Sequence, residues 1–222
     1  MFRSLFIYSS TDGHTKTICE NIISYAPSTS SIKLISLNEV SNIKISEYDK
    51  IIIGASIRYG RHNRKVLDFV KKNKNVLDLK KTAFFSVNVV ARKLEKNSPT
   101  TNPYVIKFLK KTNWKPNNIA VFAGKVDYPN YNFINKNIIR FIMMITNGPT
   151  DTSQSFEFTN WEEVKKFAKD IKISLYLSKL IDNLGLKLLY HNTILLTQTS
   201  KSPQYEHTRI KRKKLREVNH RG

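Results

Sequence analysis

Short runs of β-branched and apolar residues alternate with longer amphipathic runs over the first 175 residues of the chain. The short runs predict five strands, at residues 4–8, 32–36, 50–55, 82–87 and 118–123. The longer runs predict helices near residues 15–25, 64–72, 103–112 and 161–176, and Asn160 suits the N-cap of the last one. This alternation is typical of an α/β fold built on a parallel sheet.

Polar loops follow three of these strands. They read "SSTDGHT" after the first strand, "SIRYGRHN" after the third and "SVNVVARK" after the fourth. Ligands of open α/β sheets bind beyond the carboxyl ends of the strands, which is where all three loops begin. We therefore expect the functional site at this edge of the sheet.

The first loop has the composition of a phosphate-binding turn. Ser9, Ser10 and Thr15 offer hydroxyl groups, Gly13 lets the backbone approach closely, and the following helix presents free N–H groups. The loop matches neither G-x-x-x-x-G-K-S/T nor G-x-G-x-x-G, so a triphosphate or dinucleotide site is disfavoured. A monophosphate bound without a metal remains, and an ordinary hydroxyl-rich capping turn is the alternative.

Composition limits the size and the partners of the protein. With 222 residues and 40% hydrophobic residues, the chain can bury one sizeable core. Lys and Arg number 38 and Asp and Glu 17, and the resulting net charge of +21 favours an anionic partner such as nucleic acid, acidic lipid or an acidic substrate. A solvated basic surface is the alternative. The basic run that closes the chain lacks interleaved aromatic residues, so no nucleic-acid partner is expected.

Two further features bear on location and on metal binding. Cys19 is the single cysteine, which excludes an internal disulfide and an all-cysteine metal site, and we expect it to be a buried helix residue. The apolar run "LFIY" ends at Ser9 and Ser10, so we expect no secretory signal. No run reaches the roughly 20 apolar residues that span a bilayer. We expect a cytoplasmic protein.

At the level of whole motifs the chain resembles a known family. "STDGHT" is similar to the FMN-phosphate loop of flavodoxins. "IIIGASIRYG", "FFSVNVVARK" and "GKVDYP" together resemble the menaquinone-dependent protoporphyrinogen IX dehydrogenases, and the similarity runs from about residue 3 to about residue 175 through "TNPYVIKFL", "NWKPNNIAVFAG" and "TDTSQ". Flavodoxins proper commonly have threonine at the position of Asp12, whereas aspartate is usual in this family. We interpret Asp12 as giving its backbone N–H, with its side chain turned to a local cap.

The resemblance implies a fold and a division of the chain. The fold would be a flavodoxin-like three-layer α/β sandwich with a five-stranded parallel sheet of order 2-1-3-4-5 and an insertion after or within the fifth strand. Residues 1–176 would form the FMN-binding domain, with the insert at about 124–155. Residues 177–222 would form a basic C-terminal extension, for which disorder is one interpretation.

The resemblance also implies an activity. The protein would use noncovalent FMN and no metal to oxidise protoporphyrinogen IX to protoporphyrin IX in three two-electron steps, passing electrons to a membrane quinone, menaquinone or ubiquinone. A flavodoxin-type electron carrier, a generic FMN quinone reductase and a binding module are the alternatives. Carried over by position, the cofactor-binding residues are Ser9, Ser10, Thr11, Asp12, Gly13, His14, Thr15, Ser56, Ile57, Arg58, Tyr59, Gly60, Ser86, Val87, Asn88, Val89, Ala91 and Arg92.

Several of these side chains have a second interpretation. Tyr59 is the candidate for stacking on the flavin ring, or an ordinary surface aromatic in a turn. Arg58, Arg92 and Lys93 are candidates for clamping a substrate propionate, or solvated loop charges. His14 and His62 are candidates for proton transfer, although lone loop histidines usually have no such role.

The segment at residues 124–154 is longer than a plain strand-to-helix link and resembles the insertion of long-chain flavodoxins. Its apolar run "NIIRFIMMI" at 137–145 is too short to cross a bilayer and contains Arg140. We expect an amphipathic element that helps to accept tetrapyrrole and quinone or touches the membrane, and core packing against the sheet is the alternative. With the net charge, this predicts peripheral attachment to the inner face of the cell membrane, through an anionic lipid surface.

Overall fold

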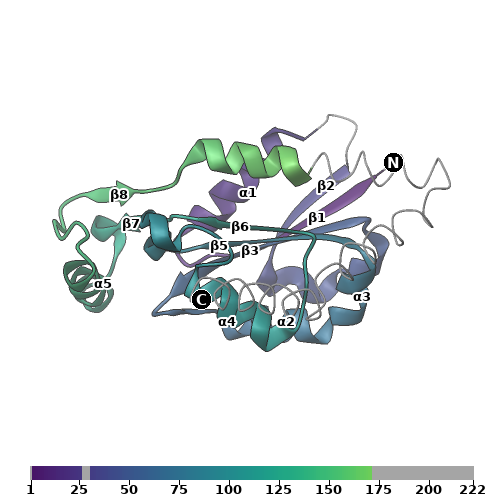
Figure 1. The fold of residues 1–222 in the computed structure, drawn as a ribbon, viewed down its shortest axis with the longest axis horizontal. Coiled ribbons are helices and arrows are strands. Elements are labelled where there is room, and N and C mark those ends of the chain that lie inside the picture. The colour runs from purple at the N-terminus through teal and green to yellow at the C-terminus, as the bar shows by residue number, and fades with distance from the viewer. Residues whose placement is uncertain (1, 27–30, 172–222) are drawn as a thin grey trace, which may run out of the picture. The chain divides into compact units, whose positions relative to one another are not determined.

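A computed structural model describes residues 2–26 and 31–171 of the chain (Figure 1). The predicted end of the last helix and the predicted extension at residues 177–222 lie outside the described residues.

The centre of the fold is a sheet with five parallel strands. They are β1 (Arg3–Ser9), β2 (Ser31–Ser36), β3 (Lys50–Arg58), β5 (Lys81–Val87) and β6 (Asn118–Phe122), in the order β2-β1-β3-β5-β6. Every neighbouring pair among them is parallel. The predicted order 2-1-3-4-5 is confirmed, and the order reverses between β1 and β3, so the loops after these strands lie on either side of the switch point.

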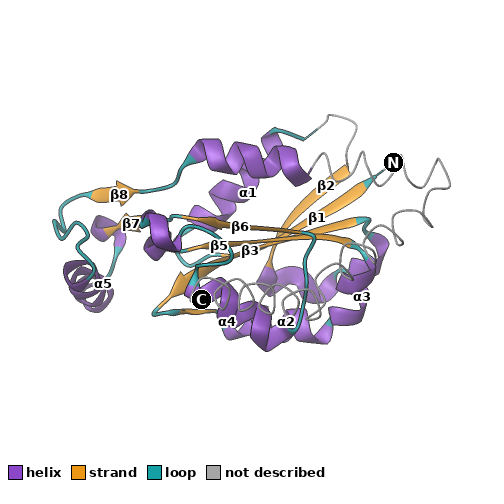
Figure 2. Ribbon diagram, in the orientation of Figure 1, coloured by secondary structure: helices purple, strands orange, loops and turns teal. Residues whose placement is uncertain are grey.

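Helices cover both faces of this sheet (Figure 2). α1 (His14–Ser24) and the helix at residues 161–171 pack on one face. α2 (Arg64–Lys72), α3 (Lys74–Leu79) and α4 (Pro103–Thr112) pack on the other. The predicted bounds of α2 and α4 are confirmed, because the helices begin at side-chain caps from Asn63 and Asn102. Asn160 likewise accepts hydrogen bonds from the N–H groups of residues 162 and 163.

Each central strand buries side chains on both faces. In β3, Ile51 and Ile53 contribute to the core under α2 and α4, whereas Ile52 packs in the core under α1. Full burial of such a side chain contributes roughly 1.5–3 kcal/mol, which explains the continuous apolar runs of this sheet. Cys19 is fully buried in the second core, as predicted, and burial raises the pKa of its thiol.

A tight hairpin extends the third strand beyond its predicted end. Residues 57 and 58 of β3 pair with β4 (Arg61–His62) in antiparallel fashion. The two-residue turn consists of Tyr59 and Gly60, whose φ angles are +49° and +73°. Positive φ at both turn residues is the backbone that suits the twist of a hairpin. A bulky residue rarely adopts it, so the sequence did not predict a hairpin at this position.

The insert forms a small unit of its own after β6. β7 (Lys125–Asp127) pairs with β8 (Ser155–Glu157), and α5 (Phe133–Ile145) lies between them in the chain. Val126, Tyr128, Tyr131 and Met143 form a separate hydrophobic cluster there. The alternative that the insert packs into the core of the main sheet is therefore wrong, and α5 lies beyond one end of the parallel sheet (Figure 1).

The remaining short elements are 3-10 turns that the sequence pattern did not predict. They are η1 (Leu37–Asn42), η2 (Ile45–Glu47), η3 (Val89–Arg92), η4 (Leu94–Lys96) and η5 (Tyr128–Asn130). Over the described residues, no helix combines the length and the apolar character that a membrane span needs.

Candidate functional site

The first polar loop connects β1 to α1 and exposes a set of hydrogen-bond donors. Gly13 is the N-cap of α1 with φ +80°, and its carbonyl accepts from the N–H groups of Lys16 and Thr17 at 2.9 and 3.2 Å. Ser10 Oγ accepts from the N–H of Thr15 at 3.3 Å. Within the described part of the chain, the N–H groups of residues 11–14 find no acceptor. This cluster of free donors at a helix N-terminus has the geometry of an anion site.

A buried hydroxyl in the same turn supports that interpretation. The Thr15 side chain is 1% exposed, and its Oγ1 has no hydrogen-bond partner among the described residues. Leaving a buried polar group unpaired costs about 1–3 kcal/mol. The residues of this turn therefore fit the phosphate of FMN, which would accept from this hydroxyl and from the backbone.

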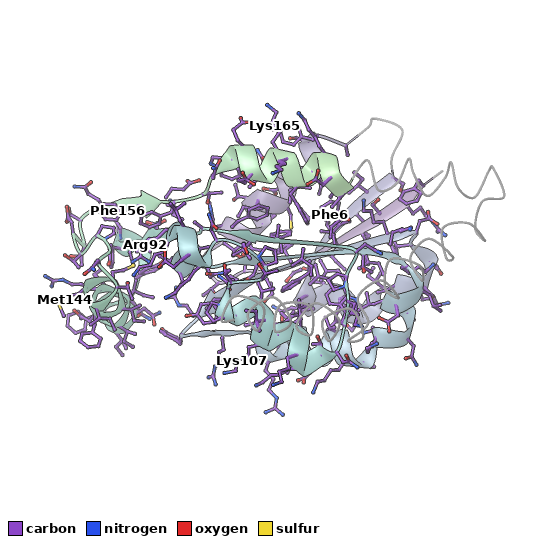
Figure 3. All side chains as sticks on the ribbon, in the orientation of Figure 1. Phe6, Arg92, Lys107, Met144, Phe156 and Lys165 are labelled. Atoms are coloured by element: carbon purple, nitrogen blue, oxygen red, sulfur yellow. The ribbon has the colours of Figure 1, made fainter. Side chains whose placement is uncertain are left out.

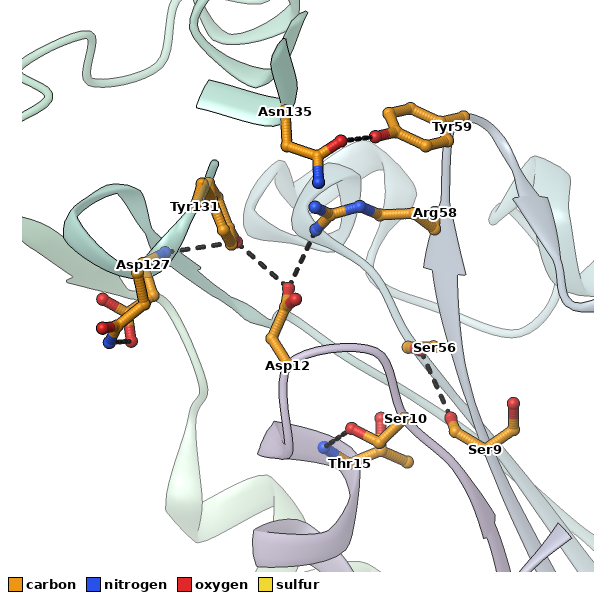
Figure 4. Close-up of polar contacts among 11 residues, drawn as sticks. Ser9, Ser10, Asp12, Thr15, Ser56, Arg58, Tyr59, Asp127, Tyr131 and Asn135 are labelled. Atoms are coloured by element: carbon orange, nitrogen blue, oxygen red, sulfur yellow. Dashed lines mark hydrogen bonds and ion pairs between the residues drawn. The ribbon is translucent and has the colours of Figure 1, made fainter. Parts of the chain in front are cut away.

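The side chain of Asp12 does not form the predicted local cap, and that interpretation was wrong. Its carboxylate accepts from Arg58 Nη1 at 2.9 Å and from the Tyr131 hydroxyl at 3.1 Å (Figure 4). Asp12 thus links the first loop to the end of β3 and to the insert. The ion pair also directs the carboxylate toward Arg58, away from its own helix.

Arg58 lies between aromatic rings as well as beside Asp12. Its guanidinium carbon is 4.8 Å from the centre of the Tyr131 ring and 5.4 Å from that of Tyr59. Burial lowers the pKa of Arg58, but the Asp12 carboxylate and hydrogen bonds to the two tyrosines outweigh it, and the net pKa is raised. The Tyr59 hydroxyl donates to Asn135 Oδ1 of α5. These contacts tie the hairpin turn to the insert.

The three polar loops and the insert meet at a cavity of about 110 Å³. The predicted residues that line it are Asp12, Ile57, Arg58, Tyr59, Gly60, Asn88 and Val89. The predicted convergence of the loops is therefore confirmed at this cavity. Sequence reasoning missed Tyr104. It placed the other lining residues in the third loop and the insert without singling them out: Val90, Lys125, Val126, Tyr131, Ile139, Ile142 and Met143.

Other predicted residues are buried next to the loops or hold the loops in place by hydrogen bonds. Ser86, Val87 and Ala91 are buried. Asn88 holds the third loop, because its Oδ1 accepts from the N–H of Ala91 and from Asn102 Nδ2. Ser56 Oγ donates to the carbonyl of Ser9 at 3.3 Å, which joins the first and second loops.

Arg92 joins the third loop to the end of α5. Its Nη2 donates to the carbonyl and the hydroxyl of Thr146 at 2.7 and 2.9 Å, and its Nη1 donates to the carbonyl of Val89 at 3.0 Å. Burial lowers the pKa of Arg92. Lys93 follows it, and over the described residues its hydrogen bonds, to Val90 and Lys96, involve its backbone alone. The clamp role of both side chains stays a prediction.

Both candidate histidines have structural contacts. Thr159 Oγ1 donates to the carbonyl of Ala123, so it accepts from His14 Nε2 at 2.7 Å. Burial lowers the pKa of His14. His62 packs on Phe108 and bonds Ser86 Oγ at 3.0 Å, and burial lowers its pKa to about 4. Near neutral pH both imidazoles are therefore uncharged.

The described residues contain no cluster of three or more His, Cys, Asp or Glu side chains that could hold a metal ion. The polar groups at the cavity are instead amides, hydroxyls, two cations and one carboxylate, and the two cations are each near an acid. Arg58 pairs with Asp12, and Lys125 Nζ lies 3.2 Å from Asp127. This arrangement suits the binding and positioning of a ligand in the cavity.

Several known proteins are similar to this chain. The flavodoxin domain model matches residues 5–153. Protoporphyrinogen IX dehydrogenase (quinone) of Leishmania major is 40% identical over 170 residues, which cover 76% of this chain and 74% of that protein. The protein of the same name from Escherichia coli strain K12 is 37% identical over 170 residues, covering 76% of this chain and 94% of that one. A solved archaeal flavodoxin is 16% identical, with a TM-score of 0.42 over 79% of this chain and 99% of that chain.

The chain belongs to the flavodoxin domain family. Within it, the chain belongs to the family of the quinone-linked protoporphyrinogen IX dehydrogenases, and the resemblance drawn from its motifs is confirmed.

Proposed function

We propose that the chain binds FMN and oxidises protoporphyrinogen IX to protoporphyrin IX, with a membrane quinone, menaquinone or ubiquinone, as the electron acceptor. In this reaction the substrate loses six electrons and six protons in three two-electron steps, and three quinones become three quinols. Bound FMN supplies the redox chemistry. The observation that carries the proposal is the first loop, with its unpartnered Thr15 hydroxyl and free N–H groups, next to a cavity that all three loops line.

The residues of the chain itself would bind FMN and position it. Residues 11–15 would hold the phosphate, and residues 57–60 and 88–90 would flank the ring. The cavity of about 110 Å³ is smaller than the roughly 300 Å³ of typical ligand pockets. Entry of the ring therefore requires side chains to move, and the contacts from Tyr131 and Asn135 of the insert to the loops are those in its way.

A flavodoxin-type carrier is the second candidate. Carriers dock on partners of opposite charge. A chain with a net charge of +21 does not have the acidic character that docking to a basic partner requires. The exposed apolar side chains beside the cavity suit an apolar substrate or acceptor better than a charged protein surface.

Anaerobic stopped-flow absorbance tests the reaction directly. The full chain, loaded with FMN, is mixed with protoporphyrinogen IX, and we expect bleaching of the flavin band followed by its return when a menaquinone analogue is added. FMN-loaded protein that stays oxidised with substrate would refute the proposed activity. Flavin that is reduced by substrate but reoxidised only by a carrier protein would exclude the quinone.

We further infer that α5 is a membrane-contact surface. Phe133, Phe141 and Ile145 are 81%, 58% and 62% exposed. Met144 of the same helix is also exposed (Figure 3). The same helix contains Lys136 and Arg140. Exposed apolar residues with basic neighbours are the composition of interfacial helices, which bind anionic lipid. Such a surface would bring the cavity close to a quinone dissolved in the bilayer.

Vesicle flotation tests this inference. The full chain should bind anionic vesicles at low salt, and the double substitution Phe133→Ser with Phe141→Ser should reduce the bound fraction severalfold. Ile106→Ser is the control, because Ile106 is a 47% exposed apolar residue on α4. Deleting residues 201–222 removes eight Lys and Arg and two Asp and Glu. The deletion therefore distinguishes the contribution of the charged chain end to vesicle binding from that of α5. Equal binding by the α5 variant and the control would refute the role of α5.

A further inference from the structure

A groove of about 390 Å³ runs between α2 and α4, on the face of the sheet opposite α1. α2 contributes Arg64, Leu67, Asp68 and Lys71. α4 contributes Tyr104, Lys107, Phe108 and Lys111. Both sets have the spacing i, i+3, i+4 and i+7, which places each set on one face of its helix. The two helices therefore present matching stripes to one another across the groove.

The groove has an apolar floor and a basic rim. Leu67, Phe108 and His62 form the apolar part, and Phe108 is stacked on the buried Phe84 ring at 4.7 Å. The cationic side chains at the rim are Arg61, Arg64, Lys71, Lys107 and Lys111, all of them exposed. Lys107 extends from α4 in Figure 3.

Four of these five cations lack counter-charges in the described part of the chain. Asp68 is the single acidic residue at the groove, and it lies 3.7 Å from Arg64. The side chains of Arg61, Lys71, Lys107 and Lys111 have no ion pair or hydrogen bond to any described residue. Lys74 of α3, by contrast, is paired with Asp78. Unpaired like charges around a hollow create a positive potential that attracts an anionic ligand.

The groove adjoins the cavity at the three loops. Gly60 and Tyr104 line both. A ligand with its apolar body at the cavity and anionic arms along α2 and α4 would therefore contact both sites at once. Arg58 and Arg92, by contrast, already use their guanidinium groups within the protein.

We propose that the groove between α2 and α4 binds the carboxylates of the tetrapyrrole substrate. The proposal rests on the proposed function. The substrate is a large apolar macrocycle with two propionates, and the propionates match the basic rim of the groove while the macrocycle lies at the adjoining cavity. Lysine and arginine at the rim would hold the propionates through charge-assisted hydrogen bonds.

The test uses two double variants with the same change in net charge. Lys107→Glu with Lys111→Glu reverses two charges at the groove. Lys72→Glu with Lys110→Glu is the matched control, because these lysines lie on the same two helices but do not line the groove. Binding of protoporphyrin IX and of its dimethyl ester to the FMN-loaded full chain is followed by fluorescence, and KM and kcat are measured with protoporphyrinogen IX.

We expect the groove variant to bind protoporphyrin IX at least 10-fold more weakly than the control and to raise KM by a similar factor, with kcat changed less than threefold. The dimethyl ester, which has no carboxylates, should bind both variants equally. Equal porphyrin affinities and KM values for the groove variant and the control would overturn the groove assignment. The proposed function would still stand in that case if protoporphyrinogen IX reduces the flavin of the wild type. Failure of the wild type to be reduced by substrate would instead refute the function itself.

Anionic headgroups and free phosphate are the other sources of negative charge. Inorganic phosphate at millimolar concentration should compete weakly, and binding to anionic vesicles should be the same for both variants. A groove variant that loses vesicle binding but keeps porphyrin affinity would overturn the proposal in favour of a lipid-headgroup site.

Discussion

The first loop and the groove between α2 and α4 both present positive potential to an anion, but they do so by different means. The loop uses backbone N–H groups and the buried Thr15 hydroxyl, all fixed by the turn into α1. The groove uses exposed lysine and arginine side chains at the ends of flexible stems. Fixed dipoles select the shape of a ligand group, whereas mobile surface charges attract many anions and are screened by salt.

Because of this difference, the two regions suit different kinds of ligand. A tightly held cofactor needs donors that are already in place, since little entropy is then lost on binding. A substrate that must leave as product is better held by exposed charges, because each of them contributes little to the binding free energy. The comparison therefore predicts that the two regions respond differently to mutation, pH and salt.

The largest effect is expected at the backbone of the first loop. Gly13 has φ +80°, and no atom beyond its chain neighbours lies within 4 Å of the place that a Cβ atom would take, so conformation rather than space requires glycine. Gly13→Val should abolish FMN retention, with affinity reduced more than about 100-fold, because a β-branched residue disfavours this backbone. Fluorescence titration with FMN measures it. Gly13→Asn should keep partial affinity, since asparagine tolerates positive φ, and an unchanged affinity of the valine variant would refute the loop assignment.

The next effect concerns His62 at the floor of the groove. Its pKa is about 4 in the folded protein because of burial, below the ordinary 6.5. The unfolded chain thus binds more protons between these values, so stability is full above pH 6.5 and falls as the pH drops toward 4. The loss at pH 4 should be about 2–3 kcal/mol. Urea unfolding at pH 7 and pH 4.5 measures it, and His62→Phe should reduce the difference. An equally steep pH dependence in that variant would contradict the assignment to His62.

A smaller effect separates the two regions by ionic strength. Raising the salt from 0.05 to 0.5 M should increase KM for protoporphyrinogen about 5- to 10-fold, because exposed charges are screened over a shorter distance. The dissociation constant of FMN should change by less than about threefold, since backbone N–H groups and the buried Thr15 hydroxyl carry no net charge for salt to screen. Parallel salt dependence of the two constants would show that both ligands depend on surface charge.

The sequence predicted the loop and missed the groove for a physical reason. Every donor of the loop comes from seven consecutive residues, and the helices α2 and α4 begin at local asparagine caps, so local chemistry determines both. The groove exists only because β3 and β5 are neighbours, which places helices some 40 residues apart in contact. The partners of Asp12 lie 46 and 119 residues away, so no local pattern revealed them. The hairpin of β3 and β4 was not predicted because its turn begins with Tyr59 and not with the asparagine or glycine that such turns favour.

The smallest effect concerns the contact between the insert and the hairpin turn. Asn135→Ala removes the acceptor of the Tyr59 hydroxyl but keeps the helix, because alanine is a better helix former. If this contact must open before the flavin ring can enter, its loss should speed FMN association about two- to fivefold, as expected for a hydrogen bond worth about 0.5–1 kcal/mol. Stopped-flow fluorescence with apoprotein measures the rate. Asn137→Ala is the control, because its side chain donates within α5 to the carbonyl of Phe133 at 2.9 Å and does not contact the turn. Equal association rates for the two variants would mean that α5 does not limit access to the cavity.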